Sequence, residues 1–176
     1  MKQKIYIKRF SKDVKLPKII AKGDWIDLRS AEEVTLRAPV TKIVSKGKPK
    51  EVEFSTAHIP LGVAMLLPDG MEANAVARSG TFKNYSVLQT NAYGVIDGGE
   101  FGYNGPNDEW KFPVVALRNT TIAINDRICQ FRIQLSQKAT MWQKLKWLFT
   151  SGIEIIEVDD LPEKEDRGGF STTGTK

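Results

Sequence analysis

The residues with the clearest chemical potential in this sequence lie around Asp97. The apolar pair Val95 and Ile96 leads directly into this acid, and three of the next five residues are glycines. Glycine has no Cβ, so a backbone that contains it can approach a ligand closely. The pattern favours a buried strand segment that delivers a carboxylate to a bend beside a flat ligand, although a hairpin with an ordinary turn aspartate would use the same residue types.

Polar groups suited to binding a phosphate chain occur in four other segments. These are 23–29 with Asp27, 78–81 with an Arg-Ser-Gly run, 125–131 with Gln130, and 167–174, which begins with Arg167. Together with 91–105 they resemble, in order and in spacing, the five motifs of the trimeric dUTP diphosphatases (dUTPases). The resemblance covers nearly the whole chain, and the wording of 23–29 and 127–133 is similar to the dUTPases of Bacillus and its prophages. A phage or prophage origin is therefore expected.

The resemblance implies hydrolysis of dUTP to dUMP and pyrophosphate, which keeps uracil out of DNA and supplies dUMP for thymidylate synthesis. It implies that Asp97 is the general base that activates the attacking water. It also implies a Mg²⁺ ion that Asp27 holds through water, with Arg127 bracing the site. The groups that would bind the phosphates are Arg78, Ser79, Gly80, Gln130 and Arg167.

Recognition of the nucleoside would fall to a second set of residues. In the family a hairpin pairs its main-chain groups with uracil, and a tyrosine stacks on the deoxyribose. The usual spacing is aspartate, two residues and tyrosine, but position 100 is Glu100 here. We infer a three-residue insertion within 98–102 and assign the sugar contact to Tyr103, with Phe101 as the alternative. The expected uracil and deoxyribose contacts are Asn91, Gly94, Ile96, Tyr103 and Phe170.

The family closes its site with a mobile C-terminal arm, which residues 167–174 resemble. In this comparison Arg167 meets the γ-phosphate and Phe170 stacks on uracil. The sequence departs from the family after Phe170, where Ser171 stands in place of a glycine. An aromatic residue near Trp110 or Phe112 is the alternative lid.

Composition limits the other classes of function. The formal net charge is +5, although the stretch 157–166 holds six acids against one lysine. A basic body suits a polyphosphate ligand, and no nucleic-acid-binding motif accompanies the charge, so polymeric nucleic acid is not expected as a partner. The single cysteine, Cys129, lies in an apolar run, which predicts a small core residue. With no membrane span or signal peptide, the expected location is the cytoplasm, that of the host if a phage encodes the chain.

Many short apolar segments separated by turns predict an all-β fold. The expected strands include Lys4–Lys8, Ile26–Leu28, Val34–Leu36, Ile43–Val44, Ala73–Ala77 and Ile153–Val158. The resemblance sharpens this prediction to a jelly-roll-like β-barrel over residues 1–160, with an inserted hairpin at about 42–57, followed by a flexible arm at 161–176.

One helix is predicted, from Met141 to Phe149. Thr140 and Gln143 have the spacing of a capping box at its start. Its apolar face, which also includes Trp142, Leu145 and Leu148, would pack on the barrel or serve as a partner or membrane-interface surface.

The resemblance also implies a homotrimer whose sites are shared between subunits. Two alternatives remain open. A dCTP deaminase of the same fold needs a glutamate as its base, and Glu100 and Glu109 are nearby. A nucleotide-gated phage regulator would bind a host protein through the inserted hairpin or the helix.

Overall fold

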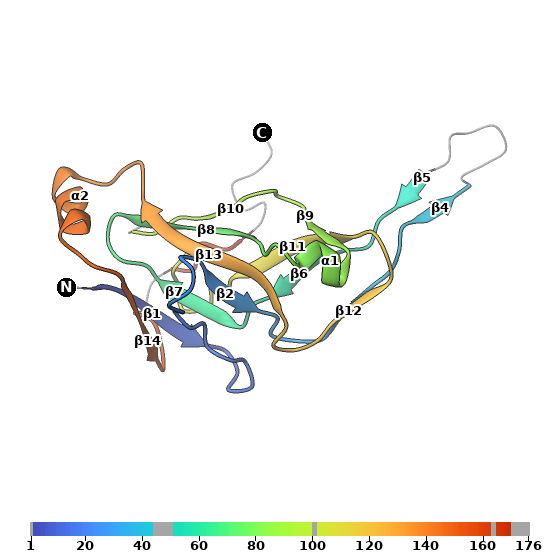
Figure 1. Ribbon diagram of the computed structural model, residues 1–176, viewed down its shortest axis with the longest axis horizontal. Helices are drawn as coiled ribbons and strands as arrows, with labels where there is room; N and C mark the ends of the chain where they lie inside the picture. Colours follow the sequence, from blue (N-terminus) through green and yellow to red (C-terminus); the bar gives the residue numbers. More distant parts are fainter. Residues whose placement is uncertain (1, 44–50, 100–101, 163–164, 170–176) are drawn as a thin grey trace.

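Alternation of apolar and polar residues gives this chain its strands, as β1 (Gln3–Arg9) shows. Ile5 and Ile7 have no exposed surface, whereas Lys4, just before Ile5, faces solvent and Tyr6 between the two isoleucines is partly exposed. The structure, a computed structural model, describes residues 2–43, 51–99, 102–162 and 165–169 (Figure 1). The other strands are β2 (Ile26–Arg29), β3 (Val34–Leu36), β4 (Val40–Lys42), β5 (Glu51–Glu53), β6 (Thr56–Pro60), β7 (Val63–Leu66), β8 (Met71–Ala77), β9 (Val87–Gln89), β10 (Gly94–Ile96), β11 (Lys111–Ala116), β12 (Thr120–Ile122), β13 (Arg127–Leu135) and β14 (Ile153–Val158).

A four-stranded antiparallel sheet in the order β10-β8-β13-β2 carries Asp27, Gly94, Ile96 and Gln130, and its strands end next to Asp97 and Arg78. β8 and β13 form its centre, while β10, which leads into Asp97, lies at one edge. β2, which contains Asp27, lies at the opposite edge. The sheet therefore holds Asp97 and Asp27 apart, at its two opposite edges.

Three smaller sheets help to enclose the core. They are β14-β1-β7, in which β14 runs parallel to β1, then β6-β11-β9 and β12-β3. The two-stranded sheet β4-β5 is exposed throughout and does not contribute to the core. In the core the ring of Trp110 meets that of Phe131 edge-on, with 5.3 Å between centroids and an interplanar angle of 81°. Cys129 is also fully buried, as expected, and burial raises the pKa of its thiol, so it acts as a small apolar residue. These arrangements confirm the all-β prediction.

The predicted hairpin begins earlier than expected. β4 and β5 pair antiparallel, from Val40 opposite Glu53 to Lys42 opposite Glu51, and project away from the body in Figure 1. The prediction of a strand at Ile43–Val44 was wrong at Ile43, because β4 ends at Lys42. Val44 lies outside the described residues. Ile43 is 77% exposed, so it has no core contact of the kind that the alternating pattern assumed.

The structure has two short helices where one was predicted. α1 (Thr81–Tyr85) has only five residues, too few to produce a helical periodicity in the sequence. α2 (Met141–Leu148) is the predicted helix, and its capping box between Thr140 and Gln143 is present. Across the described ranges, neither helix is long and apolar enough to span a membrane.

The predicted packing of α2 on the barrel was wrong about which face packs. Met141, Trp142, Leu148 and Phe149 are between 70% and 81% exposed. The helix instead contacts the body through Trp147, which packs against the core, and through Gln143, which lies against Gly70. Residues 143 and 147 are one helical turn apart and so share a face.

Candidate active site

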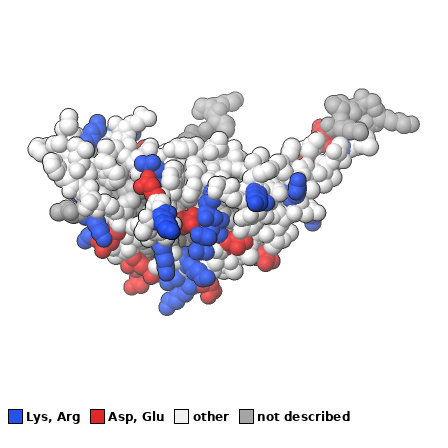
Figure 2. All heavy atoms as spheres, in the orientation of Figure 1, with Lys and Arg blue, Asp and Glu red and all other residues white. Residues whose placement is uncertain are grey.

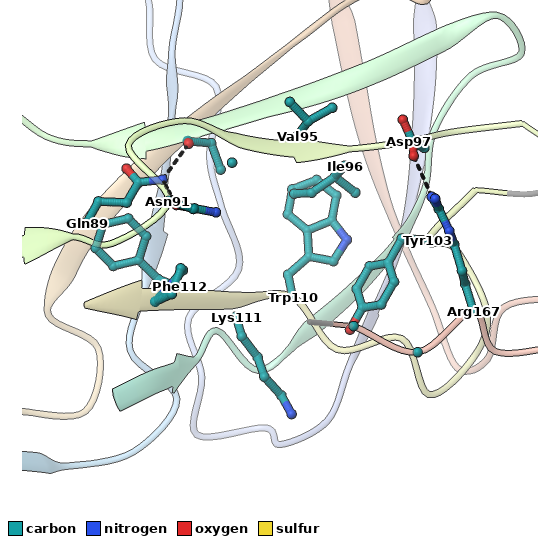
Figure 3. Close-up of a pocket in the computed structure, with 15 residues that line it drawn as sticks. Gln89, Asn91, Val95, Ile96, Asp97, Tyr103, Trp110, Lys111, Phe112 and Arg167 are labelled. Carbon is teal, nitrogen blue, oxygen red and sulfur yellow. Dashed lines mark hydrogen bonds and ion pairs between the residues drawn. The ribbon is translucent and has the colours of Figure 1, made fainter. Parts of the chain in front are cut away.

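A pocket of about 310 Å³ opens beside β10 and has the volume of a small-ligand site. Its walls come from β10, from the start of β11, and from the segment 167–169 near the C-terminus. Asn91, Gly94, Ile96, Asp97, Tyr103 and Arg167 all line it (Figure 3). The structure thus brings the expected base, sugar and general-base residues around one cavity, together with one expected phosphate ligand.

Asp97 is positioned by the backbone on both of its sides. On one side, Ile96 pairs with Ala73 of β8. On the other side, Gly98 packs so closely on β8 that a Cβ at this position would lie 2.2 Å from the Met71 carbonyl oxygen. The Tyr103 N–H then donates to the Asp97 carbonyl at 2.8 Å, which closes the intervening loop. The Asp97 carboxylate itself is half-exposed at the pocket and receives a 2.5 Å hydrogen bond from Arg167 Nη1.

Tyr103 lines the pocket in the manner expected of a sugar-stacking residue. Its hydroxyl donates to the Glu109 carbonyl at 2.7 Å, so the ring has a fixed position. Burial, followed by the nearby carboxylates of Asp108 and Glu109, raises the pKa of Tyr103 to about 12. The hydroxyl is therefore neutral at physiological pH. Phe101, the alternative, lies outside the described residues, and so do Phe170 and Glu100.

Gln89 contributes to the pocket, although sequence reasoning gave it no role. Its side-chain nitrogen donates to Ala75 O at 3.1 Å and to Asn91 Oδ1 at 2.8 Å, and its oxygen accepts from Ala77 N at 3.0 Å. Gln89 therefore ties Asn91 to the middle of β8. Only its place two residues before Asn91 marked it in the sequence, and that signal is weak.

Trp110 and Phe112 form the inner wall of the pocket. Each is only 1% exposed and both belong to the hydrophobic core, so we exclude them as a mobile lid. The indole N–H of Trp110 is buried and has no hydrogen-bond partner in the described part of the chain. Figure 3 shows this nitrogen-bearing edge turned toward the side of Tyr103 and Asp97. A buried N–H without an acceptor lowers the stability of the fold, because it has lost its hydrogen bonds to water.

A second cluster lies on β2, on β13 and in the turn that follows β8. Arg78 Nε donates to Asp27 Oδ1 at 2.6 Å, and Arg127 Nη1 donates to Asp27 Oδ2 at 3.1 Å. Gln130 lies opposite Asp27 in the β13–β2 register. In Figure 2 basic side chains crowd the surface over β2 and β13, with acidic side chains among them.

The turn 78–81 is held in place from within the fold. Thr81 is buried; its hydroxyl donates to Ile128 O at 2.7 Å and accepts from Arg78 N at 3.1 Å. Ser79 is exposed, and a Cβ at Gly80 would approach only the Asn84 amide nitrogen, at 3.4 Å. The turn therefore presents a guanidinium, a hydroxyl and a bare backbone to solvent, which suits a phosphate.

The two clusters are far apart within one chain. No residue of the Asp27 cluster lines the pocket. Asp97 follows Ile96, which pairs with Ala73, so Asp97 lies level with the start of β8. Arg78 instead follows the last residue of β8. About six residues of extended strand, roughly 20 Å, separate Asp97 from Arg78 along this direction. A single chain therefore cannot bring Asp97 and Arg78 to the same phosphate.

The described residues contain no cluster of three or more acidic, histidine or cysteine side chains that would hold a metal alone. Asp27 nevertheless would suit a magnesium ion that keeps its waters. Each carboxylate oxygen has a further lone pair beyond its bond to arginine, and this can accept from a metal-bound water. Glu109, named for the deaminase alternative, instead accepts from Gly62 N at 2.9 Å and does not line the pocket.

Comparison with solved structures places the fold. The chain resembles a dUTPase from Streptococcus mutans with a TM-score of 0.57 and 20% identity, over 73% of this chain and 94% of that one. It also resembles a dUTPase mutant from phage phi11 of Staphylococcus aureus, described with a structural Mg(II) ion, with a TM-score of 0.57 and 17% identity over 78% and 94% of the two chains. At these identities the likeness shows the fold, which is the predicted jelly-roll-like one.

Sequence comparison goes further, although no protein-family model matches the chain. A prophage-derived deoxyuridine 5′-triphosphate nucleotidohydrolase of Bacillus subtilis is 46% identical over 154 residues, which cover 88% of this chain and 86% of the relative. A deoxyuridine 5′-triphosphate nucleotidohydrolase of Thermobifida fusca is 30% identical over 97% of this chain and 79% of its own length. The fold and this identity over most of both chains together show that the chain belongs to the dUTPase family.

Proposed function

We propose that this protein hydrolyses dUTP to dUMP and pyrophosphate, with Asp97 as the general base. The observation that carries the proposal is the half-exposed Asp97 carboxylate at a pocket lined by the β10 backbone, Tyr103 and Arg167. Asp97 would take a proton from the water that attacks the α-phosphorus, while pyrophosphate departs as the leaving group. A nucleotide panel assayed for pyrophosphate release tests the substrate. Release of ammonia from dCTP in place of pyrophosphate from dUTP would contradict it.

Uracil recognition would use the free edge of β10. Among the described strands β10 pairs only with β8, so the N–H and C=O groups along its other side have no sheet partner. Such fixed donors and acceptors pair with uracil, and cytosine would leave them mismatched in a desolvated site. Gln89 supports this wall because it fixes the Asn91 side chain.

Tyr103 would exclude ribonucleotides by stacking on the deoxyribose. We expect Tyr103→Ala to hydrolyse UTP at least ~10-fold faster than the unchanged chain does, because the space for a 2′-hydroxyl opens. Tyr103→Phe keeps the ring and should keep most of the discrimination. The measurement is kcat/KM for dUTP and UTP in all three proteins. If Tyr103→Ala still rejects UTP and Phe101→Ala does not, the sugar contact belongs to Phe101.

The phosphates would be bound by Arg78, the Ser79 hydroxyl, the Gly80 N–H, Gln130 and Arg167. When bound, Mg²⁺ supplies further neutralisation of the triphosphate charge, and Asp27 would hold it through water. A phage dUTPase of the same fold is described with a structural Mg(II) ion. Arg127 would keep Asp27 in place through their ion pair. Removal of magnesium with EDTA should then suppress turnover, and added magnesium should restore it.

The separation of the two clusters supports an oligomer in which each site takes its pocket from one subunit and its phosphate cluster from another. That this oligomer is a homotrimer is what the resemblance to the trimeric dUTPases implies. Asp97→Asn and Arg78→Ala should each be nearly inactive alone. Refolded together in equal amounts, they should regain about a quarter of the normal sites, because some sites then combine two intact halves. Absence of complementation, in a mixture shown by light scattering to be trimeric, would contradict sharing.

A host-protein partner is a second candidate role, compatible with hydrolysis. Solved phage dUTPases of Staphylococcus are described as controlling the transfer of virulence genes. In this chain the β4–β5 hairpin exposes Val40, Val52 and Phe54, and α2 exposes Trp142. A chain that lacks residues 42–53 tests whether any captured host protein binds through the hairpin, and nucleotide dependence of that binding tests the gating.

A further inference from the structure

Two short segments far apart in the sequence are joined beside the pocket. Asp108, in the loop after Tyr103, is only 2% exposed, yet its carboxylate accepts from the backbone N–H groups of Arg167 and Gly168, each at 3.1 Å. Next to it, Asn107 donates to Asp166 through its backbone N–H at 2.9 Å and its side-chain amide at 2.8 Å. The start of the C-terminal arm is thus bound to this loop.

The loop is shaped for this contact. Gly105 N donates to Asp108 Oδ2 at 2.9 Å, so the buried carboxylate accepts from three backbone N–H groups in all. A Cβ at Gly105 would lie 2.3 Å from Asp166 Oδ1 and 2.9 Å from Asp166 Cα. Any side chain at position 105 would therefore push the arm away. A charged acceptor with three N–H donors gives stronger bonds than a neutral one.

The contact determines where Arg167 points. With its backbone held by Asp108, the Arg167 guanidinium reaches the Asp97 carboxylate across the pocket (Figure 3). We propose that Asp108, assisted by Asn107, is the receptor for the arm and the positioning residue for Arg167. The proposal rests on the proposed function for its kinetic consequence. When nucleotide enters, the Arg167 side chain exchanges Asp97 for a phosphate while its backbone stays on Asp108.

Asp108→Asn tests the proposal, since the amide keeps the shape but offers one acceptor oxygen and turns an NH₂ toward an N–H donor. An arginine-specific protease cuts the Arg167–Gly168 bond only when this segment leaves the loop. We expect cleavage about tenfold faster in Asp108→Asn than in the unchanged chain. For dUTP, kcat should fall at least ~5-fold with KM within ~3-fold, because initial binding is kept and closure is lost.

Asp159→Asn removes the same charge from an exposed position just after β14 and should change neither rate. Asn107→Ala, at an exposed residue, removes only the amide bond to Asp166, and should speed cleavage about 2- to 5-fold; it keeps the test decisive if Asp108→Asn does not fold. Unchanged cleavage in both Asp108→Asn and Asn107→Ala would overturn the proposal. Cleavage does not depend on hydrolysis, so a chain without dUTPase activity would refute the proposed function and leave this test standing.

Discussion

Asp97→Asn is expected to lower dUTP turnover by at least ~10²-fold, because it removes the proton acceptor and keeps the shape of the side chain. Affinity for the non-hydrolysable α,β-imido analogue should stay within a few-fold, since the walls of the pocket are unchanged. The folded state should lose little stability, because the ion pair with Arg167 is solvent-exposed: the Asp97 side chain is 50% exposed and the Arg167 side chain 37%. The measurements are single-turnover kinetics, calorimetric binding and thermal melting.

Asp69→Asn, an exposed acid in the turn before β8, is the matched control and should behave as the unchanged chain. Near-normal turnover in Asp97→Asn would remove Asp97 from the reaction. A loss of turnover together with a loss of analogue binding would instead assign Asp97 to substrate binding.

Ending the chain at Asp166 should lower turnover at saturating dUTP and magnesium by more than ~10-fold, because Arg167 and Phe170 are lost. Two N–H donors to Asp108 disappear as well, but water can reach that carboxylate once the arm is gone. The melting temperature should therefore fall by only about 2–4 °C, and the oligomer should persist.

A chain that ends at Phe170 is the control, because it keeps the arginine and the ring and loses only the last six residues. It should retain more activity than the chain that ends at Asp166. Equal turnover of the truncated and complete chains would show that the arm is dispensable for catalysis.

Much of this architecture could be predicted from sequence, because the signals were local. Ile96 and Asp97 read as a strand that ends in an acid, and the structure has β10 followed by Asp97 at a pocket. The capping box of α2 was equally local, since it joins residues three apart. The uracil, phosphate and metal assignments came from ordered motifs, and they stay predictions until the variants above are measured.

What could not be predicted depends on which distant segments meet. Asp108 looks like an ordinary loop acid in the sequence, and its arm partner lies 59 positions away. Gln89 acts through side-chain bonds to β8, which leave no periodic pattern. For α2, amphipathicity identified an apolar face but could not show what that face packs against. The helix in fact packs on the rest of the fold through Gln143 and Trp147.

The strand order of the central sheet also has a consequence for how activity depends on the amount of protein. Because β10 and β2 occupy opposite edges, one chain holds the pocket and the Asp27 cluster apart. Under the shared-site proposal, a newly made chain is inactive until it assembles with other copies. Mass action then makes specific activity fall steeply on dilution below the assembly threshold. The fold would in this way couple the onset of dUTP clearance to the level of expression.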